Sequence, residues 1–208
     1  MVNNKDAPRS VVKRLPVYLR ILDNLIRRDV DIISSSELSE ETGFTAEQIR
    51  KDLAYFGAFG TRGKGYNTSF LRDKILSIIG LDKLTNVIVI GAGHLGIALS
   101  RYTITKNPYV KIVGIFDNDP KVVGGNILGV PIYHVDEMEK VTKDNDVKAA
   151  IIAVPAEYAQ AAVDDAIRSG VKVFLNFAPT KLDVPEHVFI HNADLSIELQ
   201  SIIYYAST

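Results

Sequence analysis

Leucine and isoleucine recur at spacings of three and four near the start of the chain. This is the period of an amphipathic α-helix, and it predicts a helix over residues 15–28. The residues that carry the pattern are Leu15, Leu19, Leu22, Leu25 and Ile26. The serine cluster at 34–36 then offers an N-cap for a short second helix that carries Leu38 and ends at Gly43.

A third helix is predicted over residues 46–56, because Thr45 and Gln48 fit the capping box Thr-x-x-Gln. The segment after it is rich in glycine, which suits a tight two-stranded ribbon. Four glycines fall within nine positions: Gly57, Gly60, Gly63 and Gly65. Three helices, the last two joined by a short turn and followed by a basic ribbon, are the outline of a winged helix-turn-helix.

After Gly80 the pattern changes to apolar, β-branched runs that alternate with helical segments. Strands are predicted at about 86–90, 111–116, 149–154 and 171–175, with a late strand near 188–190. Helices are predicted near 94–106, 136–142 and 157–169, with a last helix at 195–206. This alternation favours an α/β domain with a doubly wound parallel sheet.

Composition narrows the class of protein. The chain has 208 residues, of which 47% are hydrophobic, and it has no cysteine. A disulfide framework, a thiolate metal site and a cysteine nucleophile are therefore excluded. No apolar run approaches the ~20 residues of a membrane span, and the first residues lack the apolar core of a signal peptide. We therefore expect a cytoplasmic protein with no membrane partner.

Charge is distributed unevenly along the chain. Residues 1–80 hold 13 Lys and Arg against 10 Asp and Glu, whereas residues 81–208 hold 11 against 15. All six charged residues from Asp29 to Glu47 are acidic, so the basic ones cluster in 1–28 and 50–74. Such asymmetry favours nucleic-acid contact by the basic half, although a solvated surface of mixed charge would give the same counts.

The strongest motif is Gly91-Ala-Gly93-His-Leu-Gly96, which follows a predicted strand and opens a helix. In a dinucleotide site the first glycine permits the turn, the second lets the backbone approach a pyrophosphate, and the third allows close packing. Asp117 ends the next strand, 21 residues past the third glycine. A carboxylate there accepts hydrogen bonds from ribose hydroxyls and repels a 2′-phosphate, which favours NAD(H) over NADP(H).

No catalytic group accompanies this motif. Tyr102 and Lys106 have the spacing of a short-chain dehydrogenase pair, but they lie on the helix directly after the glycine loop, where that family has no such pair. The four histidines show no metal-ligand spacing, so no metal site is predicted. We therefore expect a protein that binds a cofactor without being an enzyme.

The third helix carries the candidate DNA-binding residues. Its buried stripe is expected to be Ile49, Leu53 and Phe56, which leaves polar side chains on the other faces. Arginine can bond guanine, glutamine can bond adenine, and lysine can reach a phosphate or a base. The ribbon adds basic residues suited to a wing along the DNA backbone or in the minor groove. The candidates are Gln48, Arg50, Lys51, Tyr55, Arg62 and Lys64.

Taken together, these motifs resemble the redox-sensing transcriptional repressor family Rex over essentially the whole chain. The segments that carry the resemblance, in order, are 48–57, 60–66, 91–96, 116–120 and 175–179. The resemblance implies residues 1–80 as a winged-helix DNA-binding domain, 81–194 as a Rossmann NAD(H)-binding domain, and 195–208 as a dimerisation helix swapped between protomers.

The resemblance also implies a function. A member of this family is a homodimer that binds a palindromic operator when NADH is low and releases it when NADH rises. NADH and NAD+ act as ligands and transfer no hydride. The cofactor-binding positions implied are Gly91, Gly93, His94, Leu95, Gly96, Tyr102, Asp117, Pro155, Asn176, Ala178 and Pro179.

Three further positions match the family's redox switch: Arg20, Tyr102 and Asp194. In the family the tyrosine lies near the nicotinamide, and the Arg–Asp pair responds to the charge of that ring. Other roles stay open for each position, since Arg20 could be solvated, Tyr102 could lie in the core, and Asp194 could cap the last helix.

Two alternative functions remain. The first is an NAD-dependent oxidoreductase with an N-terminal oligomerisation domain, although the 128 residues after position 80 leave little room for a substrate domain. The second is a regulator that binds CoA or another nucleotide, since the turn-and-strand segment 124–132 resembles CoA-binding domains. Asp117 argues against CoA, because a carboxylate there would repel the 3′-phosphate of its ribose.

Overall fold

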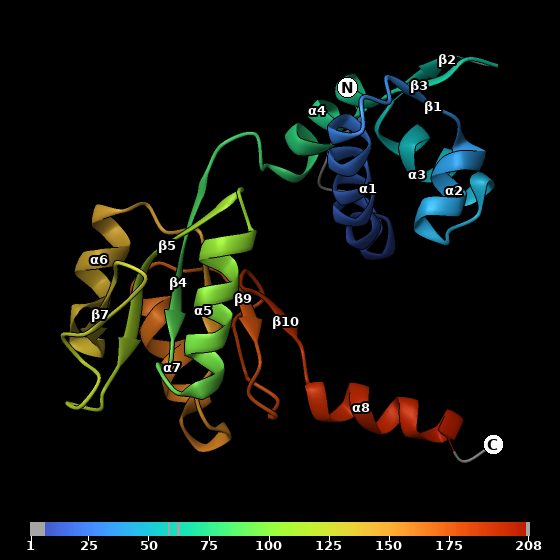
Figure 1. Cartoon of the computed structure of the whole chain (residues 1–208). Helices are drawn as coiled ribbons and strands as arrows, with labels where there is room; N and C mark the ends of the chain where they lie inside the picture. Colours follow the sequence, from blue (N-terminus) through green and yellow to red (C-terminus); the bar gives the residue numbers. More distant parts are fainter. Residues whose placement is uncertain (1–6, 58, 62, 207–208) are drawn as a thin grey trace. The chain divides into compact units, whose positions relative to one another are not determined.

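The structure is a computed structural model that describes residues 7–57, 59–61 and 63–206. The chain forms two compact units, Met1–Lys83 and Leu84–Thr208 (Figure 1). The division falls three residues beyond the boundary at position 80 suggested by the sequence pattern. Within the described residues, no helix is both long and apolar enough to cross a membrane.

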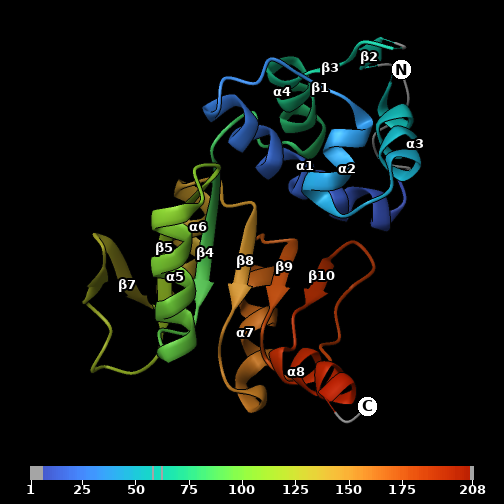
Figure 2. The same ribbon diagram turned by 45° about the vertical axis from the view of Figure 1, so that its right-hand side comes forward.

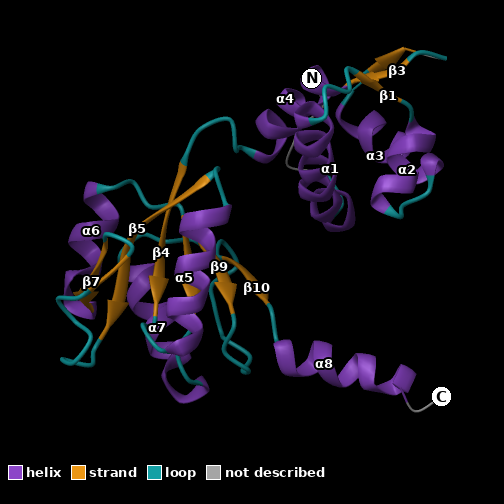
Figure 3. Ribbon diagram, in the orientation of Figure 1, coloured by secondary structure: helices purple, strands orange, loops and turns teal. Residues whose placement is uncertain are grey.

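The first unit combines four helices with a small antiparallel sheet (Figure 3). The helices are α1 (Arg9–Arg27), α2 (Ser35–Thr42), α3 (Ala46–Phe56) and α4 (Thr68–Ile79). The strands are β1 (Ile32–Ile33), β2 (Gly60–Thr61) and β3 (Gly65–Asn67), in the order β1-β3-β2. The winged helix-turn-helix arrangement predicted from the sequence is confirmed.

Local capping explains where α2 and α3 begin. Ser34 Oγ accepts a hydrogen bond from the Glu37 N–H at 3.1 Å, and the Glu37 carboxylate accepts one from the Ser34 N–H at 2.7 Å. Gly43 ends α2 in the left-handed conformation, with φ 74°. Thr45 Oγ1 caps α3 by accepting from the Gln48 N–H at 3.2 Å. Such an N-cap contributes about 1 kcal/mol to helix stability.

The structure corrects two expectations for this unit and adds two elements that were not predicted. The first helix begins at Arg9, not at residue 15, because Val11 extends its buried stripe by one turn. The capping box at Thr45 is only half formed, because the Gln48 side chain bonds Asp52 instead of turning back. Helix α4 was not predicted, although Leu71 and Ile75 are buried at helical spacing. Strand β1 also escaped prediction, because two residues carry no period.

The second unit contains a seven-stranded, mainly parallel sheet (Figure 2). Its strands are β4 (Thr85–Ile90), β5 (Val110–Asp117), β6 (Asn126–Ile127), β7 (Val130–His134), β8 (Ala149–Ile152), β9 (Val173–Asn176) and β10 (Phe189–Asn192). Its helical segments are α5 (His94–Lys106), η2 (Val135–Glu137), α6 (Met138–Asp144), α7 (Ala156–Arg168), α8 (Leu195–Ile203) and η3 (Tyr204–Ala206).

The strand order is β10-β9-β8-β4-β5-β7-β6. The chain therefore builds outward from β4 to one side, then crosses back and builds outward from β8 to the other, which confirms the doubly wound topology. Helices α6 and α7 pack on one face of the sheet with Ile88, Ile90 and Phe116. Helix α5 packs on the other face with Val87 and Val89. Ligands of such sheets bind beside the carboxyl ends of the two central strands.

The segment 124–132, in which the sequence pattern indicates a turn and a strand, forms β6, a turn and the first part of β7, and the two strands pair as a short antiparallel hairpin. Leu128 and Gly129 make this turn with positive φ values of 51° and 86°. The last helix ends one turn earlier than the predicted 195–206, since residues 204–206 form a tighter 3-10 turn.

Candidate functional site

The loop between β4 and α5 is shaped by close backbone approaches. Gly91 has φ +103°, and a Cβ built there would lie 2.5 Å from the Ala153 carbonyl oxygen. A Cβ on Gly96 would lie 1.8 Å from the Gly91 carbonyl oxygen. Any side chain at either position would collide with backbone, so both glycines are required by packing.

Gly93 differs from the other two glycines of the loop. A Cβ built there would meet no atom within 4 Å, and its backbone is extended, with φ −72°. Packing within the chain therefore does not explain this glycine. The missing side chain keeps the loop backbone open to a ligand, as the second glycine of a dinucleotide loop does.

Helix α5 begins directly at this loop. Its N-cap is Gly93, and no side chain of the described residues caps the helix end. The first amide groups of an α-helix have no partner within the helix, and they carry the positive end of its dipole. The N–H groups of His94, Leu95 and Gly96 are therefore available to a pyrophosphate.

Asp117 joins the glycine loop to the end of β5. Its Oδ2 accepts a hydrogen bond from the Ala92 N–H at 2.6 Å, and its Oδ1 accepts one from the Asp119 N–H at 2.9 Å. A carboxylate has about four acceptor positions, so two remain after these bonds. Asp117 can therefore hold the loop and still accept hydrogen bonds from a ribose diol.

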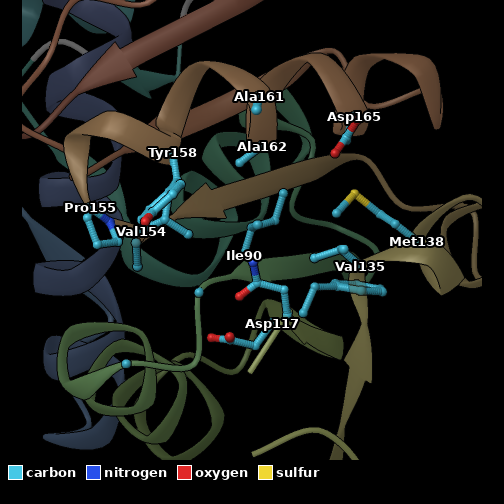
Figure 4. Close-up of a pocket in the computed structure, with 15 residues that line it drawn as sticks. Ile90, Asp117, Val135, Met138, Val154, Pro155, Tyr158, Ala161, Ala162 and Asp165 are labelled. Carbon is cyan, nitrogen blue, oxygen red and sulfur yellow. The ribbon is translucent and has the colours of Figure 1, made fainter. Parts of the chain in front are cut away.

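A cavity of about 370 Å³ opens beside the glycine loop, at the carboxyl ends of β4, β5 and β8. Figure 4 shows Asp117 on one side of it and the α7 residues Tyr158 and Ala162 on the opposite side. Val135 and Met138 line the end of the cavity away from Pro155 with apolar side chains. An apolar cavity beside a carboxylate and a free helix N-terminus suits a planar, apolar-faced base linked to a ribose and phosphates.

The structure brings only some of the predicted cofactor residues to this cavity. Those that line it are Gly91, Gly93, Asp117 and Pro155. Those outside its lining are His94, Leu95, Gly96, Tyr102, Asn176, Ala178 and Pro179. Sequence reasoning missed the lining residues Val135, Met138, Tyr158, Ala162 and Asp165. The α7 members of that set carry no sequence signal, because they belong to an ordinary amphipathic helix.

Asn176 has a structural role. It is fully buried at the end of β9, and its Nδ2 donates to the Asn192 Oδ1 at 2.9 Å. Its Oδ1 accepts from the Ala178 N–H at 2.9 Å. The amide thus joins the ends of β9 and β10 and shapes the loop that carries Ala178 and Pro179. A role for this loop in cofactor binding stays a prediction.

The three predicted switch residues lie on separate elements. Tyr102 is on α5, two turns beyond the glycine loop, and the residue is 67% exposed. Asp194 caps α8, since its Oδ1 accepts from the N–H groups of Ser196 and Ile197 at 2.9 and 3.2 Å. Arg20 is exposed on α1, in the other unit. Their joint action stays a prediction.

The first unit offers a second site, a groove of about 710 Å³ between α2, α3 and the wing formed by β2 and β3. Arg50 and Lys64 both line it, so helix and wing present cations to the same space. Arg50 Nη1 donates to the Ser35 Oγ at 2.8 Å, which holds the guanidinium near the start of α2. Arg62, the other wing cation predicted, lies outside the described residues.

The other candidate residues of α3 lie away from this groove. Lys51 pairs with Glu47 at 2.7 Å, and both side chains are about 70% exposed, so this pair is easily opened. Tyr55 is exposed to 36%. Gln48 is half-buried, and its Nε2 donates to the Asp52 Oδ1 at 2.7 Å. Within the described residues no group of three or more metal-ligating side chains is found.

Two family models match the chain. One is described as a CoA binding domain and matches residues 82–180, and the other as a putative DNA-binding protein N-terminus and matches residues 6–54. Their matched ranges lie almost entirely within the second and the first unit, respectively.

Solved structures resemble the whole chain. A protein called RSP, solved in complex with beta-NAD+ and operator DNA, is 40% identical, with a TM-score of 0.89 over 96% of this chain and 92% of that one. RSP in complex with beta-NADH is 39% identical, with a TM-score of 0.85 over 97% and 94%. RSP is described as a Rex-family repressor.

Curated relatives are more similar still in sequence. The redox-sensing transcriptional repressor Rex of Natranaerobius thermophilus is 60% identical over 97% of this chain and 92% of its own. Rex of an Exiguobacterium species is 45% identical over 98% and 93%. Glycine loop, cavity, winged helix and full-length similarity agree, and the chain belongs to the Rex family of redox-sensing transcriptional repressors.

Proposed function

We propose that this protein represses transcription by binding operator DNA through its first unit and releases the DNA when NADH binds its second unit. The observation that carries the proposal is the pairing, in one chain, of a basic winged helix with a glycine loop built for a dinucleotide. The relatives are named repressors, and RSP has been solved with NAD+ and operator DNA and with NADH. The cofactor is therefore a regulatory ligand, and the protein is not an enzyme.

The residues around the glycine loop fit NAD(H). The open position at Gly93 and the uncapped N-terminus of α5 suit a pyrophosphate. The two acceptor positions left on Asp117 suit the ribose diol, and the apolar walls at Val135 and Met138 suit the adenine. A 2′-phosphate next to the Asp117 carboxylate would be repelled, so NADH is preferred to NADPH.

The ligand must supply enough energy for the switch. Near-complete reversal of a two-state equilibrium needs about 5.5 kcal/mol of difference in affinity between the two states. A dimer has two sites, so each contributes about half. Binding is reciprocal, so operator DNA must weaken NADH binding by the same factor by which NADH weakens DNA binding.

We also propose that the protein is a homodimer formed through its last helix. Within the described part of the chain, α8 buries none of its residues. Its large apolar side chains are each more than half exposed: Leu195, Ile197, Leu199, Ile202 and Ile203. An apolar helix of this kind needs a partner surface, and exchange of this helix between two copies supplies one. A two-fold dimer would place two recognition helices on the half-sites of a palindrome.

The test is fluorescence anisotropy of a labelled, palindromic, A·T-rich duplex titrated with protein and then with NADH or NAD+. We expect binding that NADH reverses and NAD+ reverses much less. Binding of NADH without binding of any DNA would favour an NAD-dependent oxidoreductase, and displacement of NADH by CoA would favour a CoA-responsive regulator.

The oligomeric state is tested by light scattering. Ile202→Asp is expected to give monomers, whereas Glu198→Ala on the same helix is expected to stay dimeric. Cytoplasmic location follows from the proposed partner, operator DNA.

A further inference from the structure

A buried carboxylate joins the recognition helix α3 to α1. Asp52 on α3 is 1% exposed. Its Oδ2 accepts from Arg14 Nε and from the Tyr18 hydroxyl, each at 2.6 Å. Its Oδ1 accepts from Arg14 Nη2 at 2.8 Å and from Gln48 Nε2 at 2.7 Å. All four acceptor positions of the carboxylate are thus occupied.

This network is a side-chain link between α1 and α3. The backbone neighbour of α3 is α2, whereas Arg14 and Tyr18 reach Asp52 from α1 with long side chains. Phe44, in the turn before α3, strengthens the link. The Arg14 guanidinium lies 5.9 Å from the Phe44 ring centre, and the Tyr18 ring meets the same ring edge-on. Helix α1 therefore holds both the turn and the helix that follows it.

The network also decides what Gln48 can do. From the sequence, Gln48 is a candidate to bond an adenine, which requires both the donor and the acceptor of its amide at the base edge. In the structure one of the two amide N–H groups donates to Asp52, one turn further along α3, so the half-buried side chain is turned toward this carboxylate. Turning Gln48 toward DNA would leave a buried carboxylate oxygen with one bond fewer, which is costly inside a protein.

We propose that Asp52 is a positioning residue for base reading, because it fixes α3 against α1 and withholds the Gln48 side chain from the DNA. Base reading then falls to Arg50 and Lys51, whose side chains are exposed on the same helix. The inference rests on the proposed DNA-binding function and names the residues of α3 that do and do not set its specificity.

The test compares the DNA motif that each variant selects from a random-sequence duplex library, followed by anisotropy on the wild-type motif and on a scrambled duplex. Gln48→Ala is expected to select the wild-type motif and to bind it within about threefold of wild type, since three bonds to Asp52 remain. Asp52→Asn is expected to lower the ratio of specific to non-specific affinity by about tenfold, because a bond from Arg14 to a full charge is lost. Its scrambled-duplex affinity and salt dependence should not change, since these report phosphate contacts.

A matched control separates positioning from general damage to the fold. Asp23 and Arg72 form another half-buried ion pair in the same unit, at 3.0 Å between α1 and α4. Asp23→Asn is expected to keep the wild-type specificity ratio. Should Asp52→Asn fail to fold, Tyr18→Phe removes a single hydrogen bond from the network and is expected to lower the ratio by a smaller factor.

Two results would overturn the proposal. One is a Gln48→Ala protein that loses preference for a base pair in the motif, since Gln48 would then read that base. The other is a wild-type specificity ratio in folded Asp52→Asn, or in Tyr18→Phe where Asp52→Asn does not fold. A wild-type protein that selects no motif at all would instead refute the proposed DNA-binding function.

Discussion

The glycine loop of the second unit and the recognition helix of the first are held by different kinds of contact. The loop is held mainly by backbone: the Gly91 N–H bonds the Phe116 carbonyl at 2.8 Å, and two glycines pack against carbonyl oxygens, with one side-chain contact from the Asp117 carboxylate. The recognition helix is held by side chains that converge on one buried carboxylate, Asp52. Each site must keep its shape, and both depend on residues distant in the sequence, but the glycines of the loop form a motif that is visible in the local sequence.

The difference also sets how each site responds to substitution. A backbone-built loop has no tolerance for an added atom at a packed glycine, because its neighbours cannot move aside cheaply. When one side chain of a hydrogen-bond network is removed, the other bonds remain, so a single substitution in the network is expected to have only a partial effect. The following predictions use this contrast, beginning with the largest expected effect.

Gly96→Ala should nearly abolish NADH binding and also lower stability, because its Cβ would lie 1.8 Å from the Gly91 oxygen. Overpacking of this kind costs about 1–3 kcal/mol or more. Gly93→Ala should lose NADH affinity with an unchanged melting temperature, since its Cβ meets open space within the chain. NADH fluorescence titrations and thermal melts separate the two effects. Equal loss of stability in both variants would contradict the different roles assigned to these glycines.

Arg50→Ala or Lys51→Ala should weaken operator binding by about 10- to 100-fold, as expected when a bidentate base contact worth about 1–3 kcal/mol is lost. The affinity for NADH should not change, because both residues belong to the first unit. Anisotropy with operator DNA and NADH titration measure the two quantities. Wild-type DNA affinity in both variants would remove these residues from the interface.

Asp117→Ala should weaken NADH binding by about tenfold and give a repressor that stays on DNA in the presence of NADH. The substitution removes both the ribose acceptor and the bond that holds the Ala92 N–H. A charged hydrogen bond of this kind contributes about 1.5–3 kcal/mol. Asp119→Asn, two residues further along, is the control. Normal release of Asp117→Ala by NADH would disprove the ribose assignment.

Arg20→Ala should narrow the difference between the NADH and NAD+ affinities severalfold if it belongs to the redox switch. The two ligands differ by one positive charge on the ring, and an ion pair near that charge can favour one of them. Competition titrations give the ratio. A ratio equal to that of wild type would leave Arg20 as a solvated residue of α1.

The smallest effect concerns pH. Burial alone would raise the pKa of Asp52, but hydrogen bonds from Arg14, Tyr18 and Gln48 outweigh it and hold that pKa below its usual value. The folded state therefore binds this proton less readily than the unfolded chain does, and the stabilisation present above about pH 4 is lost as the pH falls further. Denaturant unfolding should show a shallower acid dependence in Asp52→Asn. An unchanged slope would mean that Asp52 is not ionised in the folded protein.

Much of the fold was predictable from the sequence, because many of its helices and strands are marked by residues close together along the chain. Residues 46–56 and 94–106 are helices with the predicted bounds, since a capping threonine and a glycine loop mark their starts. The central strand beginning at Thr85 was equally clear as an apolar run between polar segments. Helix α4 was missed although Asn67 caps its start and Leu71 and Ile75 have helical spacing, whereas strand β1 was missed because two residues carry no period.

The sequence by itself determined the two units, the glycine loop and its carboxylate, because glycine spacing and strand periodicity are properties of neighbours along the chain. Only the tertiary structure decided which side chains meet. The partners of Asp52 on α1 lie 34 and 38 positions away, and the cavity combines residues from three strand ends with α6 and α7. Gln48 shows most clearly what the sequence could not predict. Its position on α3 follows from a local pattern, but the hydrogen bond from its amide to Asp52 depends on how side chains pack around a buried charge.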